Sequence, residues 1–166
     1  KGVCAFREPK TIRVNLTGKR GSKVFAKDVA LEITRRITMG GATDHVIEYR
    51  GEAIESMTME ERMTISNMAI ECGATSGICM PDETTLDYLW PFIAAEYGND
   101  RAKALSAFRA WWSDDDAEYA KVIDIDLTGY EPLATTGYKP DQVFPLRELG
   151  EHRIDQVYIG SCTNGR

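Results

Sequence analysis

The sequence predicts an α/β protein in which one layered α/β/α domain is followed by the start of a second, similar domain. Stretches with the two-residue period of strands alternate with stretches at helical spacing, and the composition changes from about residue 90 onwards. Such alternation is typical of α/β layers. We therefore expect residues 1–92 to form the first domain, residues 93–116 a helical linker, and residues 117–166 the beginning of the second domain.

Two strands with a helix between them are predicted in the first third of the chain. Residues 11–17 alternate apolar and polar side chains, as a half-buried strand does. Residues 26–37 repeat apolar side chains at helical spacing and precede two glycines that can end a helix. Residues 45–49 predict a second strand, which is closed by Gly51.

The next predicted helix is capped by Ser56 or Thr58 and stops at Gly73. Glu61 follows Thr58 by three residues and completes a capping-box pattern, while glycine commonly follows the last helical turn. Residues 77–79 then predict a short strand, and residues 82–89 predict a helix. The segment thus continues the alternation of helices and strands.

The remainder of the chain contains more irregular sequence. Residues 102–112 are alanine-rich and helical, and an acidic, solvated run at residues 113–116 ends that helix. Residues 121–127 alternate like a strand, after which glycines and prolines predict an irregular connection. Residues 157–159 are β-branched or aromatic, so we expect them to form a buried strand.

Composition and charge exclude several classes of protein. The 166 residues are 43% hydrophobic, enough for one sizeable core or for a small domain plus part of another. A formal net charge of -6 without any basic run argues against a nucleic-acid surface. No stretch is long enough to span a bilayer, and the first residues lack the apolar region of a secretory signal. We therefore expect a cytoplasmic protein that binds neither nucleic acid nor membrane.

The four cysteines are Cys4, Cys72, Cys79 and Cys162. Their spacing matches neither a zinc site nor a redox Cys-x-x-Cys pair, and in an intracellular protein they should be reduced. Cys72 and Cys79 flank a short turn and are expected only to pack there. Cys162 follows the predicted terminal strand, so its thiol should lie at the carboxyl edge of a sheet, where open α/β folds bind ligands. A buried structural cysteine is the alternative.

Three blocks of sequence carry a family resemblance. Residues 159–164 read Ile-Gly-Ser-Cys-Thr-Asn, residues 81–85 read Pro-Asp-Glu-Thr-Thr, and residues 51–74 form the longest block. The first of these strings resembles the first cluster-ligand motif of the aconitase superfamily, especially of its 3-isopropylmalate dehydratase and homoaconitase large subunits. The longest block resembles the central block of the same large subunits, and Pro-Asp-Glu-Thr-Thr is typical of the 3-isopropylmalate dehydratase branch. One departure is Gly165, where the family often has serine. The blocks follow the family order, and the resemblance covers nearly the whole chain.

This resemblance implies an enzyme. It implies a hydro-lyase that isomerises a small hydroxy-diacid by dehydration and rehydration, with a 4Fe-4S cluster as cofactor and a separate small subunit as partner. The 3-isopropylmalate dehydratase of leucine biosynthesis is the first expectation, while homoaconitase, another aconitase-family hydratase or a non-catalytic interaction module of the same fold are alternatives. By the same comparison the upstream catalytic region and a downstream Cys-x-x-Cys pair are missing. We therefore expect an internal segment that is inactive alone and holds no stable cluster.

The resemblance also assigns site residues. It makes Cys162 the first cysteine ligand of the cluster, and therefore the residue that binds cofactor and metal. It aligns Asn67 and Glu71 with catalytic residues near the cluster, where the amide would donate to a cluster sulfur and the carboxylate would hold a catalytic histidine or hydroxide. Four residues apart on a helix, these two share a face, for which a solvated stripe is the alternative interpretation. Thr163 and Asn164 are expected to shape the turn.

Overall fold

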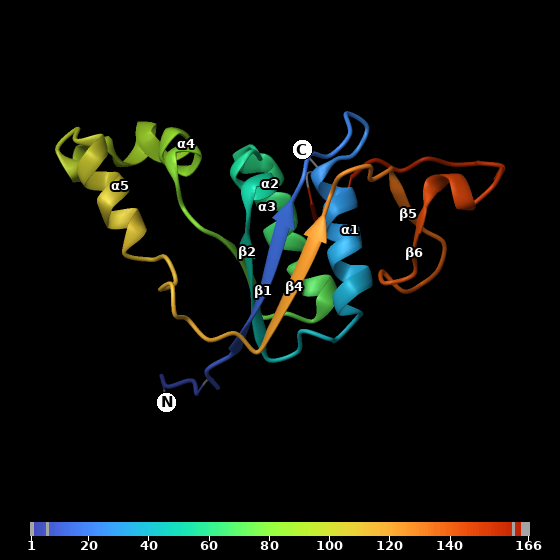
Figure 1. The fold of residues 1–166 in the computed structure, drawn as a ribbon, viewed down its shortest axis with the longest axis horizontal. Helices are drawn as coiled ribbons and strands as arrows, with labels where there is room; N and C mark the ends of the chain where they lie inside the picture. The colour runs from blue at the N-terminus through green and yellow to red at the C-terminus, as the bar shows by residue number, and fades with distance from the viewer. Residues whose placement is uncertain (1, 6, 161, 164–166) are drawn as a thin grey trace.

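The computed structural model describes residues 2–5, 7–160 and 162–163, and a four-stranded parallel sheet lies at its centre. The strands are β1 (Lys10–Thr17), β2 (His45–Arg50), β3 (Ser76–Cys79) and β4 (Lys121–Asp126), in the spatial order β3-β2-β1-β4. Figure 1 shows β1 and β4 side by side and pointing the same way. The three strands predicted before residue 80 and the one predicted at residues 121–127 are confirmed.

Strand β1 is central because it pairs with β2 on one side and with β4 on the other. In this register Val14 lies opposite Tyr49 of β2 and Ile123 of β4. Alternate residues of β1 point to one face, where Ile12, Val14 and Leu16 are buried. That face is the apolar surface on which the helices pack.

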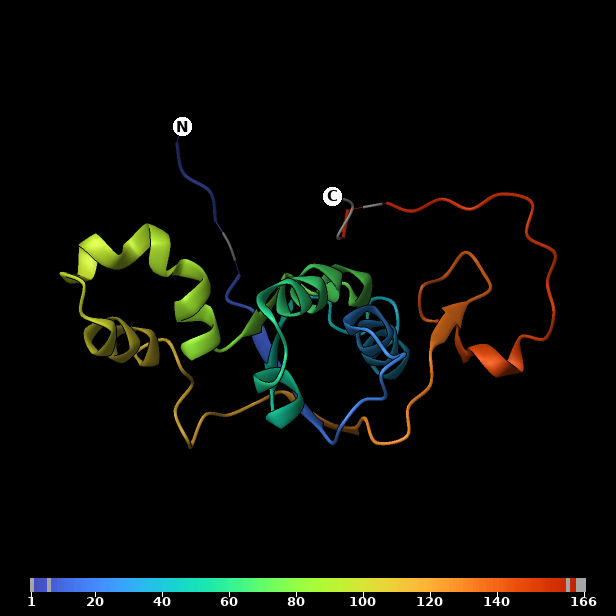
Figure 2. The ribbon, with the colours of Figure 1, turned by 90° about the horizontal axis from the view of Figure 1, so that it is seen from above.

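Helices α1 (Ala26–Ile37) and α3 (Met59–Asn67) lie side by side on this apolar face (Figure 2). The short helix α2 (Glu52–Glu55) precedes α3 and contributes two buried side chains to the same core. The bounds predicted for α1 are confirmed, and so is the α/β class with a helix-flanked parallel sheet.

The capping box that the sequence predicted at the start of α3 is present. The Glu61 N–H donates to Thr58 Oγ1 at 3.4 Å, and the Glu61 carboxylate accepts the Thr58 N–H at 3.0 Å. The end of the helix differs from the prediction, because α3 stops at Asn67 and a 3-10 helix, η1 (Met68–Cys72), continues the chain. Gly73 then takes the left-handed φ of 79° that the sequence predicted for a helix stop.

Strand β3 runs close beneath the junction of α3 and η1. A Cβ atom at Gly77 would lie 2.8 Å from Ala69 Cβ and 3.1 Å from Ser66 Cα, so only glycine fits there. This close approach fixes the position of the α3–η1 junction relative to the sheet.

The opposite face of the sheet is polar, and an irregular segment crosses it. At its centre lies Glu48 of β2, which is only 4% exposed. The Glu48 carboxylate accepts hydrogen bonds from Arg50 Nε at 2.6 Å, from the Tyr119 hydroxyl at 3.0 Å and from the Ser113 hydroxyl. The Arg50 guanidinium also lies over the Trp112 ring, 5.6 Å from its centroid. The segment 112–119 is thus fastened to the sheet.

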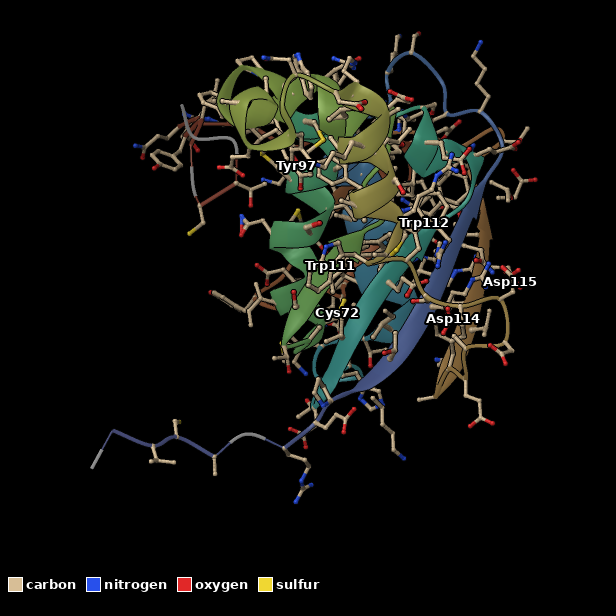
Figure 3. The ribbon with its side chains drawn as sticks, turned by 90° about the vertical axis from the view of Figure 1, so that its left-hand side faces the viewer. Cys72, Tyr97, Trp111, Trp112, Asp114 and Asp115 are labelled. Atoms are coloured by element: carbon tan, nitrogen blue, oxygen red, sulfur yellow. The ribbon has the colours of Figure 1, made fainter. Side chains whose placement is uncertain are left out.

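Three short helices project beside β3, to the left in Figure 1. They are α4 (Glu83–Ile93), the 3-10 helix η2 (Ala94–Tyr97) and α5 (Arg101–Arg109). Within them only Leu86 and Ala104 are buried. Figure 3 shows Trp111 and Trp112 just after α5, on the segment that leads to β4. No helix of the described residues has both the length and the apolar character needed to cross a membrane.

Some of the residues after 117 belong to the first sheet. Strand β4 pairs with β1 along its whole length, so residues 121–126 belong to the sheet that we expected to end before residue 93. Strands β5 (Leu133–Thr135) and β6 (Val143–Pro145) form a separate antiparallel pair, followed by the 3-10 helix η3 (Leu146–Glu148). The domain boundaries predicted for the chain stay a prediction.

The terminal strand predicted at residues 157–159 is not formed. Val157, Tyr158 and Ile159 are in no strand, and their side chains are 71–93% exposed. A β-branched run becomes a strand only where another strand satisfies its backbone hydrogen bonds. None of the strands in the described part of the chain pairs with it. The expected place of Cys162 at the carboxyl end of a buried strand is therefore wrong.

Replacing Glu48 by glutamine should destabilise the fold. The variant Glu48→Gln removes the charge that three donors surround, and we expect a loss of about 1 to 3 kcal/mol in the free energy of unfolding at pH 7. Urea titration measures this loss. Glu131→Gln, which breaks the exposed pair with Arg147, is the matched control and should cost less than about 0.5 kcal/mol.

The loss of unfolding free energy caused by Glu48→Gln should depend on pH. Burial opposes ionisation of Glu48, but hydrogen bonds from Ser113, Arg50 and Tyr119 outweigh it, so the pKa lies below the ordinary 4.5. The stabilisation by the charged form is therefore complete above pH 4.5 and is lost as the pH falls through the lower folded-state pKa. A difference in stability between wild type and Glu48→Gln that stayed the same from pH 7 down through this lower pKa would contradict this interpretation.

Candidate functional site

The structure brings Asn67 and Cys162 together, although they are 95 positions apart in the chain. The side-chain amide of Asn67 donates to the Cys162 carbonyl at 3.3 Å and to Thr163 Oγ1 at 2.7 Å. Asn67 is the last residue of α3, so the end of that helix carries the turn that contains the cysteine. The contact to Thr163 is the shorter of the two and lies within the usual range for a strong hydrogen bond.

Cys162 is a free cysteine with an exposed side chain. The chain reaches it along an outer path. After η3 no helix or strand is formed through residue 160, and Figure 2 shows this segment curving away from the sheet before it returns towards α3. Ser161 and residues 164–166 lie outside the described residues, and with them the role expected for Asn164.

Glu71 lies in η1, and its side chain is exposed. The prediction that Asn67 and Glu71 share a helical face assumed an α-helix through both residues. The chain tightens to three residues per turn after Asn67, so the four-residue spacing no longer sets their relative orientation. Both are nevertheless exposed, because the buried positions of η1 are Met68, Ala69 and Cys72.

Two further cysteines, Cys72 and Cys79, are packing residues, as the sequence predicted. Cys72 is buried and its thiol contacts Thr34 Oγ1 at 3.7 Å, while Cys79 lies 3.8 Å from Ser66 Oγ. Burial raises the pKa of both thiols, which keeps them protonated at neutral pH. Neither therefore provides a thiolate beside Cys162.

Sequence reasoning missed a buried ion pair that supports α3. Arg62 is almost fully buried, and its guanidinium binds both Asp82 carboxylate oxygens, at 2.7 and 2.8 Å. Asp82 also caps α4 by accepting the Thr85 N–H. Burial of Asp82 opposes its ionisation, but the hydrogen bonds from Arg62 outweigh it and hold its pKa below the ordinary value. The only sequence signal was that Arg62 and Asp82 each belong to one of the family-like blocks.

The arrangement provides one exposed thiol on a turn held by Asn67, and the exposed carboxylate of Glu71 follows Asn67 in the chain. Within the residues that are described, no group of three or more histidine, cysteine, aspartate or glutamate side chains is placed to hold a metal ion. Cys162 can therefore act as a single ligand, and a complete metal or cluster site needs ligands from elsewhere.

Fold and site together define an α/β domain with a free, exposed cysteine on a turn that the end of α3 holds. Comparison with known proteins identifies the family of this domain. The family model described as the aconitase family (aconitate hydratase) matches residues 2–153, and the chain belongs to this family. The matched residues end before Cys162, so the family assignment does not depend on the cysteine motif.

Individual relatives extend the similarity to the whole chain. The 3-isopropylmalate dehydratase large subunit of Geotalea uraniireducens is 60% identical over 166 residues, which are all of this chain and 39% of that protein. The large subunit 1 of Methanopyrus kandleri is 42% identical over 165 residues, covering 99% of this chain and 37% of that protein. The chain therefore spans less than two fifths of the length of these relatives.

Removal of the Asn67 amide should loosen the turn that carries Cys162. In Asn67→Ala the two hydrogen bonds are lost while no core volume is removed, so we expect the backbone order parameters of residues 162 and 163 to fall below about 0.6. Nitrogen-15 relaxation measures them. Asn15→Ala, which removes an amide bound to Asp124 on the polar sheet face, is the matched control and should leave them unchanged. Equal order in wild type and Asn67→Ala would show that other contacts hold the turn.

Proposed function

We propose that this chain is part of the large, catalytic subunit of a hydro-lyase that isomerises a hydroxy-diacid, of the 3-isopropylmalate dehydratase type that serves leucine biosynthesis. The observation that carries the proposal is the 60% identity over the whole chain to a large subunit with this name. Relatives from bacteria and from archaea carry the same name, which favours this substrate class over that of homoaconitase.

We further propose that the whole subunit binds a 4Fe-4S cluster and that Cys162 is one of its ligands. The residue fits this role because its thiol is free and exposed, and because the turn that carries it is held by Asn67. Thiolates are the usual ligands of such clusters. When bound, the cluster would supply Lewis acidity towards the hydroxyl group that leaves the substrate. Its remaining cysteine ligands would come from the rest of the subunit.

Asn67 would act on the site through Cys162. Its amide nitrogen is engaged by the Cys162 carbonyl and the Thr163 hydroxyl, so it orients the cysteine within the site. The proposal gives Asn67 this positioning role in place of the expected direct contact with a cluster sulfur.

Glu71 would serve proton transfer. Elimination of water requires a base for the carbon-bound proton and an acid for the leaving hydroxide. The Glu71 carboxylate is exposed on η1 and can hold a proton itself or accept a hydrogen bond from a histidine of the remaining subunit. Glu71 supplies one such group, and its partner lies in the rest of the subunit.

A large subunit implies a separate small subunit, and the substrate would be a small hydroxy-diacid. We also propose a cytoplasmic enzyme without a nucleic-acid partner, in line with the acidic charge. The 166 residues alone should be inactive and should retain no stable cluster, because a single thiolate at the site cannot complete its ligation.

In the whole enzyme with its small subunit, substitutions at Cys162, Asn67 and Glu71 should have different effects on iron content and turnover. Cys162→Ser should lose both iron and turnover of 3-isopropylmalate, because it removes a ligand. Asn67→Ala and Glu71→Gln should keep most of the iron, and Glu71→Gln should lower kcat by about 10²- to 10⁴-fold, as loss of a proton-transfer group does. Iron analysis and steady-state kinetics measure both quantities.

Cys4→Ser is the matched control for the ligand variant, because Cys4 is also a free, exposed cysteine. It should retain full iron and full activity. If Cys162→Ser kept its iron and normal turnover, the proposed ligand and the proposed function of this site would both be wrong.

A further inference from the structure

The side-chain amide of Asn67 has only one orientation that fits its contacts. Its nitrogen lies 3.3 Å from the Cys162 carbonyl oxygen and 2.7 Å from Thr163 Oγ1. A carbonyl oxygen accepts hydrogen bonds and never donates one, so the amide atom that faces it must be the nitrogen, which carries two hydrogens. Both contacts come from this one nitrogen. The contact with Cys162 therefore also fixes the direction of the hydrogen bond to Thr163.

This direction determines what the Thr163 hydroxyl can still do. An amide nitrogen only donates, so Thr163 Oγ1 is the acceptor in this pair. A hydroxyl group has one proton and two acceptor lone pairs, and the contact with Asn67 engages only a lone pair. The hydroxyl proton of Thr163 is thus available for a second hydrogen bond, whose acceptor lies outside this pair.

Thr163 presents this proton beside the candidate ligand. It directly follows Cys162 in the chain, and the same amide at the end of α3 holds both residues. The Thr163 side chain is half-buried, whereas that of Cys162 is exposed. A cysteine binds metal as the thiolate, and hydrogen bonds to charged acceptors are stronger than those to neutral ones. The sulfur atoms of a cluster on Cys162 would therefore be favourable acceptors for this proton.

We propose that the Thr163 hydroxyl donates a hydrogen bond to a sulfur atom of the cluster that Cys162 would bind, an inference that rests on the function proposed above. Asn67 orients the hydroxyl for this purpose by occupying its lone pair. Hydrogen bonds to cluster sulfurs withdraw negative charge and so raise the reduction potential of the cluster. Thr163 therefore tunes the potential of the cluster and is not one of its ligands.

The test measures the midpoint potential of the cluster in the whole enzyme with its small subunit. Thr163→Val keeps the shape of the side chain but removes the hydroxyl, so the midpoint potential should shift to a more negative value while the iron content stays at the wild-type level. Thr163→Ser retains a hydroxyl and should have the wild-type potential. Redox titration followed by electron paramagnetic resonance gives the potential, and iron analysis gives the content.

Thr135→Val is the matched control. Thr135 is an exposed threonine on β5, so the variant removes the same hydroxyl group on the separate antiparallel strand pair. It should change neither the midpoint potential nor the iron content.

Two results would overturn the inference while the proposed function stands. An unchanged midpoint potential in Thr163→Val, with full iron, would show that no cluster sulfur accepts this proton. Equal shifts in Thr163→Val and Thr163→Ser would assign the effect to the methyl group that serine lacks or to packing.

Loss of the cluster from Thr163→Val would leave the decision to Thr163→Ser. Wild-type iron and potential in the serine variant would support the donor role of the hydroxyl, and loss of iron from that variant as well would contradict it. A wild-type enzyme without a cluster would overturn the proposed cofactor and this inference together.

Discussion

The parallel pairing of β1 with β2 and β4 is the constraint on which the rest of the structure depends. It aligns the buried alternate residues of three strands into one apolar face, and α1 and α3 pack on that face. The close approach of Gly77 then sets the height of the α3–η1 junction above the sheet. Asn67 ends α3 at this junction, so the sheet register ultimately positions the residue that holds Cys162.

Local patterns predicted most of the fold, because each depends on residues close together in the chain. The spacing of apolar residues gave α1 its observed bounds, and the capping box marked the start of α3. The partners of strands could not be predicted in this way. Residues 121–126 have the period of a strand in either of two sheets, and only contacts 109 positions apart, such as that from Asn15 to Asp124, assign them to the first. Residues 157–159 have strand-like composition but no partner.

The site was predicted in part. The family resemblance pointed to Asn67 and Cys162, which the structure places in contact, but no local pattern could identify the Thr163 hydroxyl as the main acceptor. Two hydrogen bonds that contribute about 1 kcal/mol each can match the ordering cost of one or two residues, at about 1 to 2 kcal/mol per residue, but not that of a long segment. The Asn67 contacts therefore hold Cys162 and Thr163. Ordering of the long segment before them would, in the proposed enzyme, draw on contacts with the rest of the subunit.

The most direct measurement is a nuclear Overhauser effect between the side-chain amide protons of Asn67 and the side chain of Thr163. A nitrogen–oxygen distance of 2.7 Å brings these protons well within range, so a strong effect is predicted for the wild-type chain. Its absence, with the Asn67 amide exchanging freely with solvent, would contradict the claim that the end of α3 holds the turn that carries Cys162.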